Sequence, residues 1–155
     1  MTRGFTLIEA LVAIVVLAIV MPVAMTMLGD ASIDRARAEQ ITRASWMLSA
    51  ASEQILADAS SDAPGFGMGA FEDPAVYLDD PVSGLHARLD TVLTPYTSRG
   101  KTLSVTIGAL VSAQGVETDD ASLDLYRLVT VRVSWIDLRG DAQVMELPLL
   151  LADVL

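Results

Sequence analysis

Hydrophobic residues change their spacing three times along the chain, and each spacing predicts a different kind of structure. Residues 5–28 are apolar almost without interruption, and residues 29–59 carry apolar side chains at intervals of three and four. Residues 60–100 contain four of the six prolines and five of the ten glycines, and residues 101–155 include runs that alternate apolar and polar positions. These patterns predict a fully apolar helix, an amphipathic helix, an irregular connection and a sheet, in that order.

Residues 5–28 predict a helix that crosses a membrane. Twenty of these 24 residues are apolar, and residues 10–29 are a run of 20 without a charged side chain. At about 1.5 Å per residue, such a run covers a hydrocarbon core of about 30 Å. Pro22 is expected to bend or loosen the helix, because it removes one backbone hydrogen bond.

Three interpretations of this N-terminus compete. A secretory signal peptide normally has a shorter apolar core and a more basic start than Met-Thr-Arg-Gly. A simple signal anchor fits the length of the run. The third interpretation gives a function to Glu9, because a carboxylate inside a membrane segment costs roughly 2.5–3.5 kcal/mol on insertion scales. The alternative for Glu9 is a position at the membrane interface, from which its side chain reaches water.

The spacing of threes and fours predicts that the helix continues to about Asp58, for a total length of roughly 80 Å. Gly29-Asp30 is a candidate flexible point between its two halves. Trp46 and Met47 are expected to pack against a sheet, whereas Gln54 and Asp58 are expected on other faces. The apolar stripe consists of Ile33, Ile41, Ala44, Leu48, Ala51 and Ile55, with Arg37 at one step.

Turn-forming residues between 60 and 100 predict an irregular connection with short helical or extended pieces, one of them at 83–92. Strands are predicted at 102–107, 129–135 and 143–151, and the last two form an antiparallel hairpin around a turn at 138–141. Pro148 favours an edge position for the last strand, because it lacks an N–H. The residues expected to face the helix are Val129, Val131, Val133 and Trp135. The predicted fold class is α+β, with a long N-terminal α-helix packed on a small antiparallel β-sheet.

Composition and charge narrow the range of possible functions. The chain has 10 basic and 20 acidic residues, a formal net charge of −10 and a mean hydropathy of +0.48. Residues 29–155 carry all of this net charge, whereas residues 5–28 are almost entirely apolar. The hydrophobic and the acidic parts of the chain are therefore separate segments. Lys101 is the only lysine, and a nucleic-acid partner is not expected because phosphate binding needs a basic surface. The chain has no cysteine, which rules out disulfides and Cys-based zinc sites.

Candidate catalytic and metal-binding residues are few. His86 is the only histidine, no G-x-S-x-G turn accompanies it, and a surface position is expected. Two acidic clusters could offer oxygen ligands to calcium, but neither follows the EF-hand spacing. The sequence therefore predicts no catalytic residue, no metal and no cofactor. The two clusters are Asp79-Asp80 and the group Glu117, Asp119, Asp120 and Asp124.

The N-terminus also carries a specific motif. Residues 3–12 read Arg-Gly-Phe-Thr-Leu-Ile-Glu-Ala-Leu-Val, so that a short leader ends in Gly4, Phe5 follows, and Glu9 lies five places into the remaining chain. This segment, with the apolar run behind it, resembles the N-terminus of type IV prepilins and type II secretion pseudopilins. Basic residues flank the run on both sides, so charge does not orient it, and the orientation depends on the resemblance.

The resemblance implies a mechanism. A prepilin peptidase would cleave between Gly4 and Phe5 on the cytoplasmic side of the inner membrane and would then N-methylate Phe5. Glu9 would pair with the N-terminal amine of a neighbouring subunit in a fibre, which gives a physical reason for a charge in an apolar segment. Other pilin or pseudopilin subunits and an inner-membrane assembly platform are the further partners implied.

Together these observations predict three segments. Residues 1–4 are a leader peptide, residues 5–28 a transmembrane and assembly helix, and residues 29–155 an extracytoplasmic pilin-like domain on a single-pass anchor. Within that domain, 29–59 is helix, 60–100 is a variable connecting region and 101–155 is the sheet. The predicted function is a structural, non-enzymatic minor pilin or pseudopilin subunit of a type II secretion pseudopilus or type IV pilus. The alternative is a membrane-anchored extracytoplasmic binding domain that enters no fibre.

Overall fold

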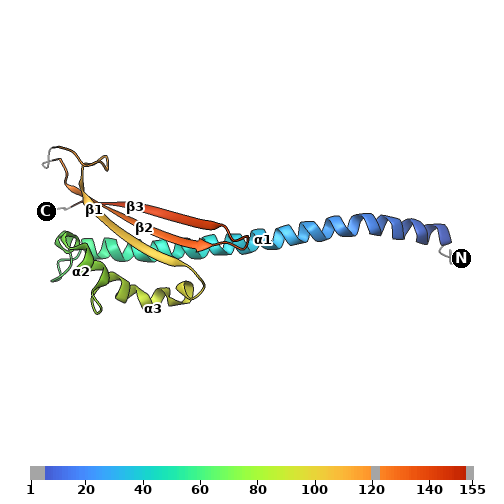
Figure 1. The fold of residues 1–155 in the computed structure, drawn as a ribbon, viewed down its shortest axis with the longest axis horizontal. Helices are drawn as coiled ribbons and strands as arrows, with labels where there is room; N and C mark the ends of the chain where they lie inside the picture. The colour runs from blue at the N-terminus through green and yellow to red at the C-terminus, as the bar shows by residue number, and fades with distance from the viewer. Residues whose placement is uncertain (1–5, 120–122, 153–155) are drawn as a thin grey trace. The chain divides into compact units, whose positions relative to one another are not determined.

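The computed structural model describes residues 6–119 and 123–152, and the chain divides into two compact units, Met1–Glu39 and Gln40–Leu155. One helix, α1 (Leu7–Ala59), runs through both units (Figure 1). The predicted helix is therefore confirmed, and it continues without a break through Pro22 and Gly29. Of the residues that the structure describes, only α1 supplies a segment long and apolar enough to cross a membrane.

Three strands form an antiparallel sheet in the order β1-β2-β3: β1 (Thr102–Val111), β2 (Tyr126–Ile136) and β3 (Ala142–Ala152). All three extend beyond the predicted strands, because backbone pairing continues past the alternating apolar positions. The β1–β2 register shifts between Ile107 and Leu110, and β2 and β3 stay in register from Tyr126↔Ala152 to Ile136↔Ala142. The edge position predicted for the strand that contains Pro148 is confirmed.

The core of the second unit lies between the sheet and the C-terminal part of α1. Every second residue of β2 points into it, and Val129, Val131 and Val133 are fully buried. Helix α1 contributes a stripe of buried residues that are spaced three and four positions apart, as predicted. The buried members of that stripe are Ala44, Met47, Leu48, Ala51 and Ile55. This packing confirms the α+β architecture.

Three expectations for the side chains of α1 are wrong. Trp46 is 58% exposed, because it lies on the side of the helix away from the residues that meet the sheet. Asp58, expected on another face, is only 4% exposed, since it continues the spacing of Ala51 and Ile55. Ile41, assigned to the stripe, is 43% exposed. Apolar or polar character alone therefore misplaced three side chains on this helix.

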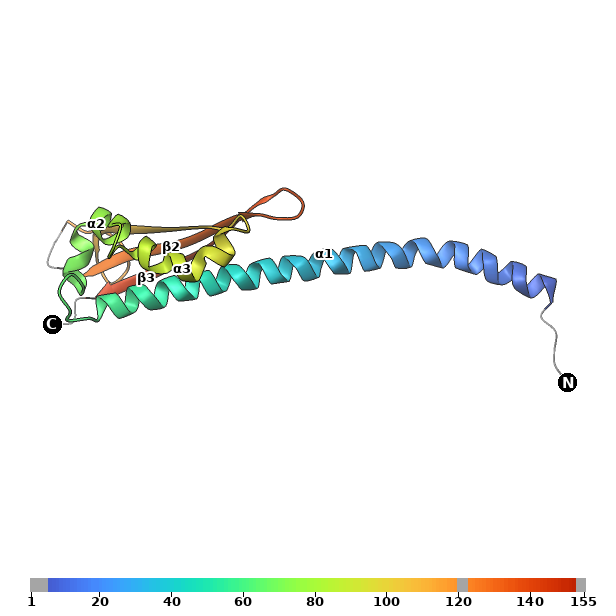
Figure 2. The ribbon, with the colours of Figure 1, turned by 90° about the horizontal axis from the view of Figure 1, so that it is seen from below.

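The connecting region forms three short helices, η1 (Met68–Glu72), α2 (Pro74–Asp79) and α3 (Leu85–Thr97). They place Phe71, Tyr77 and three leucines of α3 in the core, and α3 lies near β1 in Figures 1 and 2. Gly84 precedes α3 where no side chain fits, because a Cβ there would be 2.5 Å from the carbonyl oxygen of Asp80. The piece predicted at 83–92, helical or extended, is the helix α3, which continues past Pro95.

Candidate functional site

The first turn of α1 contains the charged residue of the apolar segment. The backbone N–H of Thr6 donates to Oε2 of Glu9 at 3.4 Å, and the Thr6 hydroxyl donates to the same oxygen at 3.3 Å. Thr6-Leu7-Ile8-Glu9 thus forms half of a capping box, in which a carboxylate at the third position satisfies a free donor at the helix start. The T-x-x-E spacing is a sequence signal for this capping role that apolar periodicity does not reveal.

This arrangement leaves Glu9 available to an external cation. Its side chain is exposed, and its two hydrogen bonds are long, so little is lost when they exchange for a stronger partner. Gly4 and Phe5, the two residues of the predicted cleavage site, lie outside the described residues.

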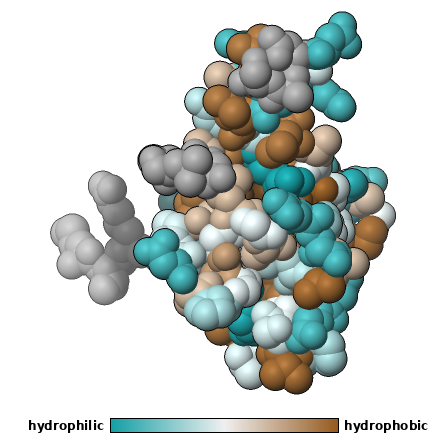
Figure 3. Space-filling model, turned by 90° about the vertical axis from the view of Figure 1, so that its left-hand side faces the viewer, coloured by the Kyte–Doolittle hydropathy of each residue, from teal (hydrophilic) through white to brown (hydrophobic). Residues whose placement is uncertain are grey.

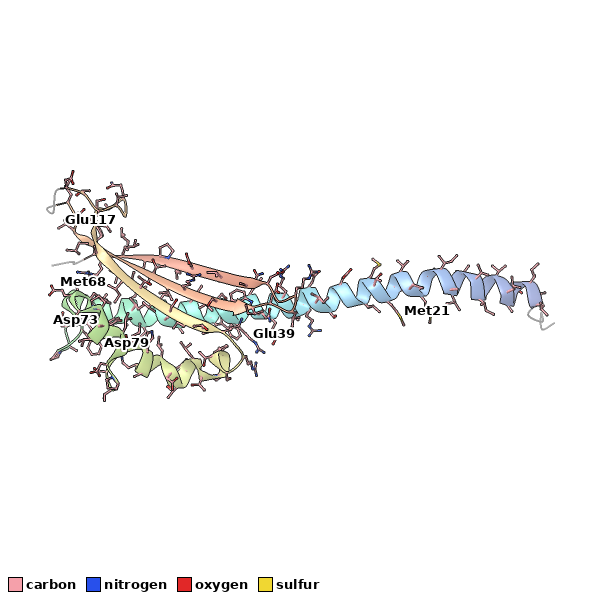
Figure 4. The ribbon with its side chains drawn as sticks, viewed as in Figure 1. Met21, Glu39, Met68, Asp73, Asp79 and Glu117 are labelled. Atoms are coloured by element: carbon pink, nitrogen blue, oxygen red, sulfur yellow. The ribbon has the colours of Figure 1, made fainter. Side chains whose placement is uncertain are left out.

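Behind Glu9, the apolar side chains of α1 in the first unit are exposed. Leu7 is 85% exposed, and residues as far as Leu28 (71%) are similarly open. Figure 4 shows side chains projecting all around this part of the helix, with Met21 among them. An uninterrupted apolar surface of this length does not persist in water, so lipid or other protein chains must cover it.

Asp58, near the end of α1, is the centre of a polar cluster in the second unit. Both of its oxygens receive hydrogen bonds from Arg88 of α3, at 2.8 and 2.7 Å, in a two-pronged ion pair. The Tyr77 hydroxyl of α2 donates to Asp58 at 2.6 Å, and the Gln54 amide donates at 2.9 Å. The Arg88 guanidinium also lies over the rings of Phe66 and Tyr77. One carboxylate therefore ties α1 to α2 and α3.

The charges in this cluster are matched. Burial by itself would raise the pKa of Asp58, but hydrogen bonds from Arg88, Tyr77 and Gln54 and the charge of Arg88 outweigh it and lower that pKa. Burial and the adjacent carboxylate raise the pKa of the Tyr77 phenol. Asp58 therefore stays ionised and Tyr77 neutral at ordinary pH. Every oxygen of Asp58 is occupied, so the cluster is suited to holding the fold rather than to proton transfer.

The acidic clusters predicted as possible calcium ligands are dispersed. Asp79 pairs with His86 at 2.8 Å on the surface, where His86 was expected. Asp80 accepts hydrogen bonds from Ser83 and Val82, which lower its pKa, and Asp124 accepts two from Thr118. Figure 4 places Asp79 at the end of α2 and Glu117 on the loop after β1. Asp120 lies outside the described residues, which contain no metal-binding group of three or more acidic, His or Cys side chains.

Comparison with known protein families gives a match at the N-terminus. A family model described as the prokaryotic N-terminal methylation motif matches residues 1–21. The chain therefore carries the type IV prepilin-like signature at its N-terminus, and the resemblance of residues 3–12 is confirmed. Neither the curated proteins nor the solved structures contain a match to the chain.

The motif and the helix together indicate a membrane-anchored, pilin-like structural subunit. The motif implies processing by a prepilin peptidase and assembly with other pilin subunits, and it indicates a structural subunit rather than an enzyme. The long apolar helix behind it fits a single-pass membrane anchor. The match covers residues 1–21 and does not extend into the second unit.

Proposed function

We propose that this chain is a structural minor pilin or pseudopilin subunit, processed by prepilin peptidase and assembled through residues 5–28 into a type II secretion pseudopilus or a type IV pilus. The methylation motif, followed directly by the exposed apolar part of α1, carries the proposal. The absence of cysteine favours a minor subunit or a pseudopilin, because type IV major pilins often close a C-terminal loop with a disulfide. No catalytic role is assigned to any residue.

In this proposal the peptidase cleaves between Gly4 and Phe5 and methylates the new N-terminus at Phe5. Residues 29–155 then form the extracytoplasmic domain, anchored in the inner membrane until an assembly platform there inserts the subunit into the fibre. Glu9 pairs with the N-terminal amine of a neighbouring subunit. The long, exposed hydrogen bonds that Glu9 makes to Thr6 support this role, since a full positive charge is a stronger partner than either donor.

The intact mass of the full chain, purified from cells with and without a prepilin peptidase, tests the processing. A chain that begins at N-methylated Phe5 is expected only when the peptidase is present. A chain that still begins at Met1 in both strains would contradict the proposal and favour a membrane-anchored domain that enters no fibre.

Glu9→Gln tests the pairing, because it removes the charge and keeps the shape. Processing at Phe5 is expected to continue, while the fraction of the chain recovered in sheared fibres falls about tenfold or more, as expected for loss of a charge pair in an apolar environment. Glu53→Gln is the matched control, since Glu53 is an exposed acid of the same helix in the second unit. Equal incorporation of the Glu9 variant and the control would argue against the pairing.

A further inference from the structure

Lys101, the only lysine of the chain, is almost completely buried in the second unit. It is 5% exposed and directly precedes β1, after Gly100 has turned the chain with φ 77°. Its Nζ lies 4.3 Å from the centre of the Trp135 ring, which belongs to the strand paired with β1. The face of a tryptophan ring attracts a cation, so this contact favours the ammonium form of the lysine.

The ammonium group of Lys101 has no anionic partner. Among the residues that the structure describes, Nζ makes no hydrogen bond and no ion pair. Burial lowers the pKa of Lys101, and the positive charge of Arg43 lowers it further. Nζ is not among the unpaired side-chain atoms that are sealed from solvent, so a small molecule can reach it. Because a buried charge is costly unless it is paired, an anion bound at this group removes an electrostatic cost.

A cavity of about 360 Å³ lies beside Lys101, between α3 and the start of β1. This volume is within the range of small-molecule binding sites. Leu89 and Leu93 line the cavity from one face of α3, where both are buried, and Leu103 lines it from β1. The cavity therefore combines a mainly apolar wall with one buried cation, and such a combination suits a ligand that has an anionic end and an apolar end.

Two polar residues of α3 also line the cavity. Asp90 is the single acid among the lining residues, and its carboxylate lies 3.4 Å from the Thr94 hydroxyl. His86 is paired with Asp79. Asp90 is exposed, so water and salt screen its charge, whereas the charge of Lys101 is buried and acts more strongly on a ligand inside the cavity. The cavity therefore favours an anion, and Asp90 weakens this preference without reversing it.

Two other cavities of the second unit do not offer an unpaired cation. In a cavity of about 300 Å³ near Pro64, the basic lining residue is Arg88, whose charge is matched by Asp58. A cavity of about 530 Å³ at the end of α1 is lined by Asp62 and by no basic residue. Figure 3 looks onto that end of the unit, where hydrophobic residues lie among hydrophilic ones. An anion is therefore better matched by the cavity beside Lys101.

We propose that the cavity between α3 and β1 binds a small carboxylate with an apolar tail, whose oxygens accept hydrogen bonds from Nζ of Lys101 while the tail packs against the three leucines. One ammonium group neutralises one carboxylate, whereas a phosphate monoester carries close to two negative charges at pH 7. The proposal does not depend on the proposed function, because every residue of the site lies in the second unit.

Nuclear magnetic resonance of the full chain in a non-ionic detergent tests the site. Labelling with [13C]lysine gives one lysine signal, because Lys101 is the only lysine. We expect hexanoate to shift this signal with a Kd of about 1–10 mM, since a ligand of this size has few atoms that contribute to binding. Hexan-1-ol lacks the charge and inorganic phosphate lacks the tail, so both should bind at least about tenfold more weakly.

Three variants test the role of the charge, with saturation transfer from the aromatic protons of the protein to hexanoate as the measurement. Lys101→Met keeps a long apolar side chain and should weaken the binding of hexanoate at least about tenfold. Arg99→Met is the matched control, because Arg99 is an exposed cation outside the lining, and it should leave the Kd unchanged. Asp90→Asn, at an exposed position, should strengthen binding about two- to fivefold.

Equal binding of hexanoate and hexan-1-ol would show a merely apolar cavity and overturn the proposal. Tighter binding of phosphate than of hexanoate would overturn the chemical class. A lysine signal that hexanoate does not shift, or equal binding by Lys101→Met and Arg99→Met, would also contradict the site. If denaturant unfolding shows that Lys101→Met does not fold, the lysine signal and Asp90→Asn decide, and binding that Asp90→Asn does not strengthen then counts against the proposal.

Discussion

The ion pair between Asp58 and Arg88 allows a quantitative test of the fold of the second unit. Arg88→Met removes both charged hydrogen bonds and keeps a long apolar side chain near Phe66 and Tyr77. The Asp58 carboxylate, which is 4% exposed in the wild type, is then left with only Tyr77 and Gln54 as donors.

Removing one partner of a buried ion pair costs about 3–5 kcal/mol, because the remaining charge stays buried. Here the two remaining donors offset part of that loss, so we expect the free energy of unfolding to fall by about 3 kcal/mol at pH 7. For a unit of this size, that corresponds to a fall in Tm of roughly 10 °C.

The pH dependence has a defined sign. In the wild type the pKa of Asp58 is lowered, so its contribution to stability is present above the unfolded pKa of about 3.9 and is lost as the pH falls through the folded value. Without Arg88, burial becomes the dominant effect and the folded pKa of Asp58 rises. The neutral form of Asp58 then tolerates burial without Arg88. We therefore expect the difference in the free energy of unfolding between variant and wild type to shrink below about pH 4.

Denaturant unfolding of the full chain in detergent, followed by the fluorescence of the buried Trp135, measures both effects. The control is Arg132→Met, which breaks an ion pair with Glu146 whose side chains are both 51% exposed, and it should cost less than about 1 kcal/mol. The reasoning would be refuted if Arg88→Met lowered the free energy of unfolding no more than Arg132→Met does. It would also be refuted if the effect of Arg88→Met were as large at pH 3.5 as at pH 7.

Two further substitutions test the connecting region and the sheet edge. Gly84→Ala should lower the free energy of unfolding by about 2 kcal/mol, because its Cβ would be 2.5 Å and 2.9 Å from backbone oxygens, whereas Gly69→Ala meets nothing within 4 Å. Equal effects of these two in the same denaturation assay would contradict the steric argument. Pro148→Thr should increase light scattering by the purified chain, because it restores an N–H to the edge strand β3. Unchanged scattering would mean that other residues, such as Glu146, protect this edge.

Local spacing determined the elements of this protein. Three patterns indicated which side of the backbone meets an apolar environment: the uninterrupted apolar run, the spacing of threes and fours in α1, and the alternation in β2. Each pattern is contained within a few neighbouring residues. The N-terminal motif is equally local, which is why residues 3–12 were enough to indicate the kind of protein.

Only the tertiary structure decided which faces of α1 are covered. Asp58 is buried because Arg88, 30 residues later in the chain, lies opposite it, and no local pattern predicts such a partner. Trp46 is exposed because the sheet meets the other side of the helix, although its apolar character favoured burial.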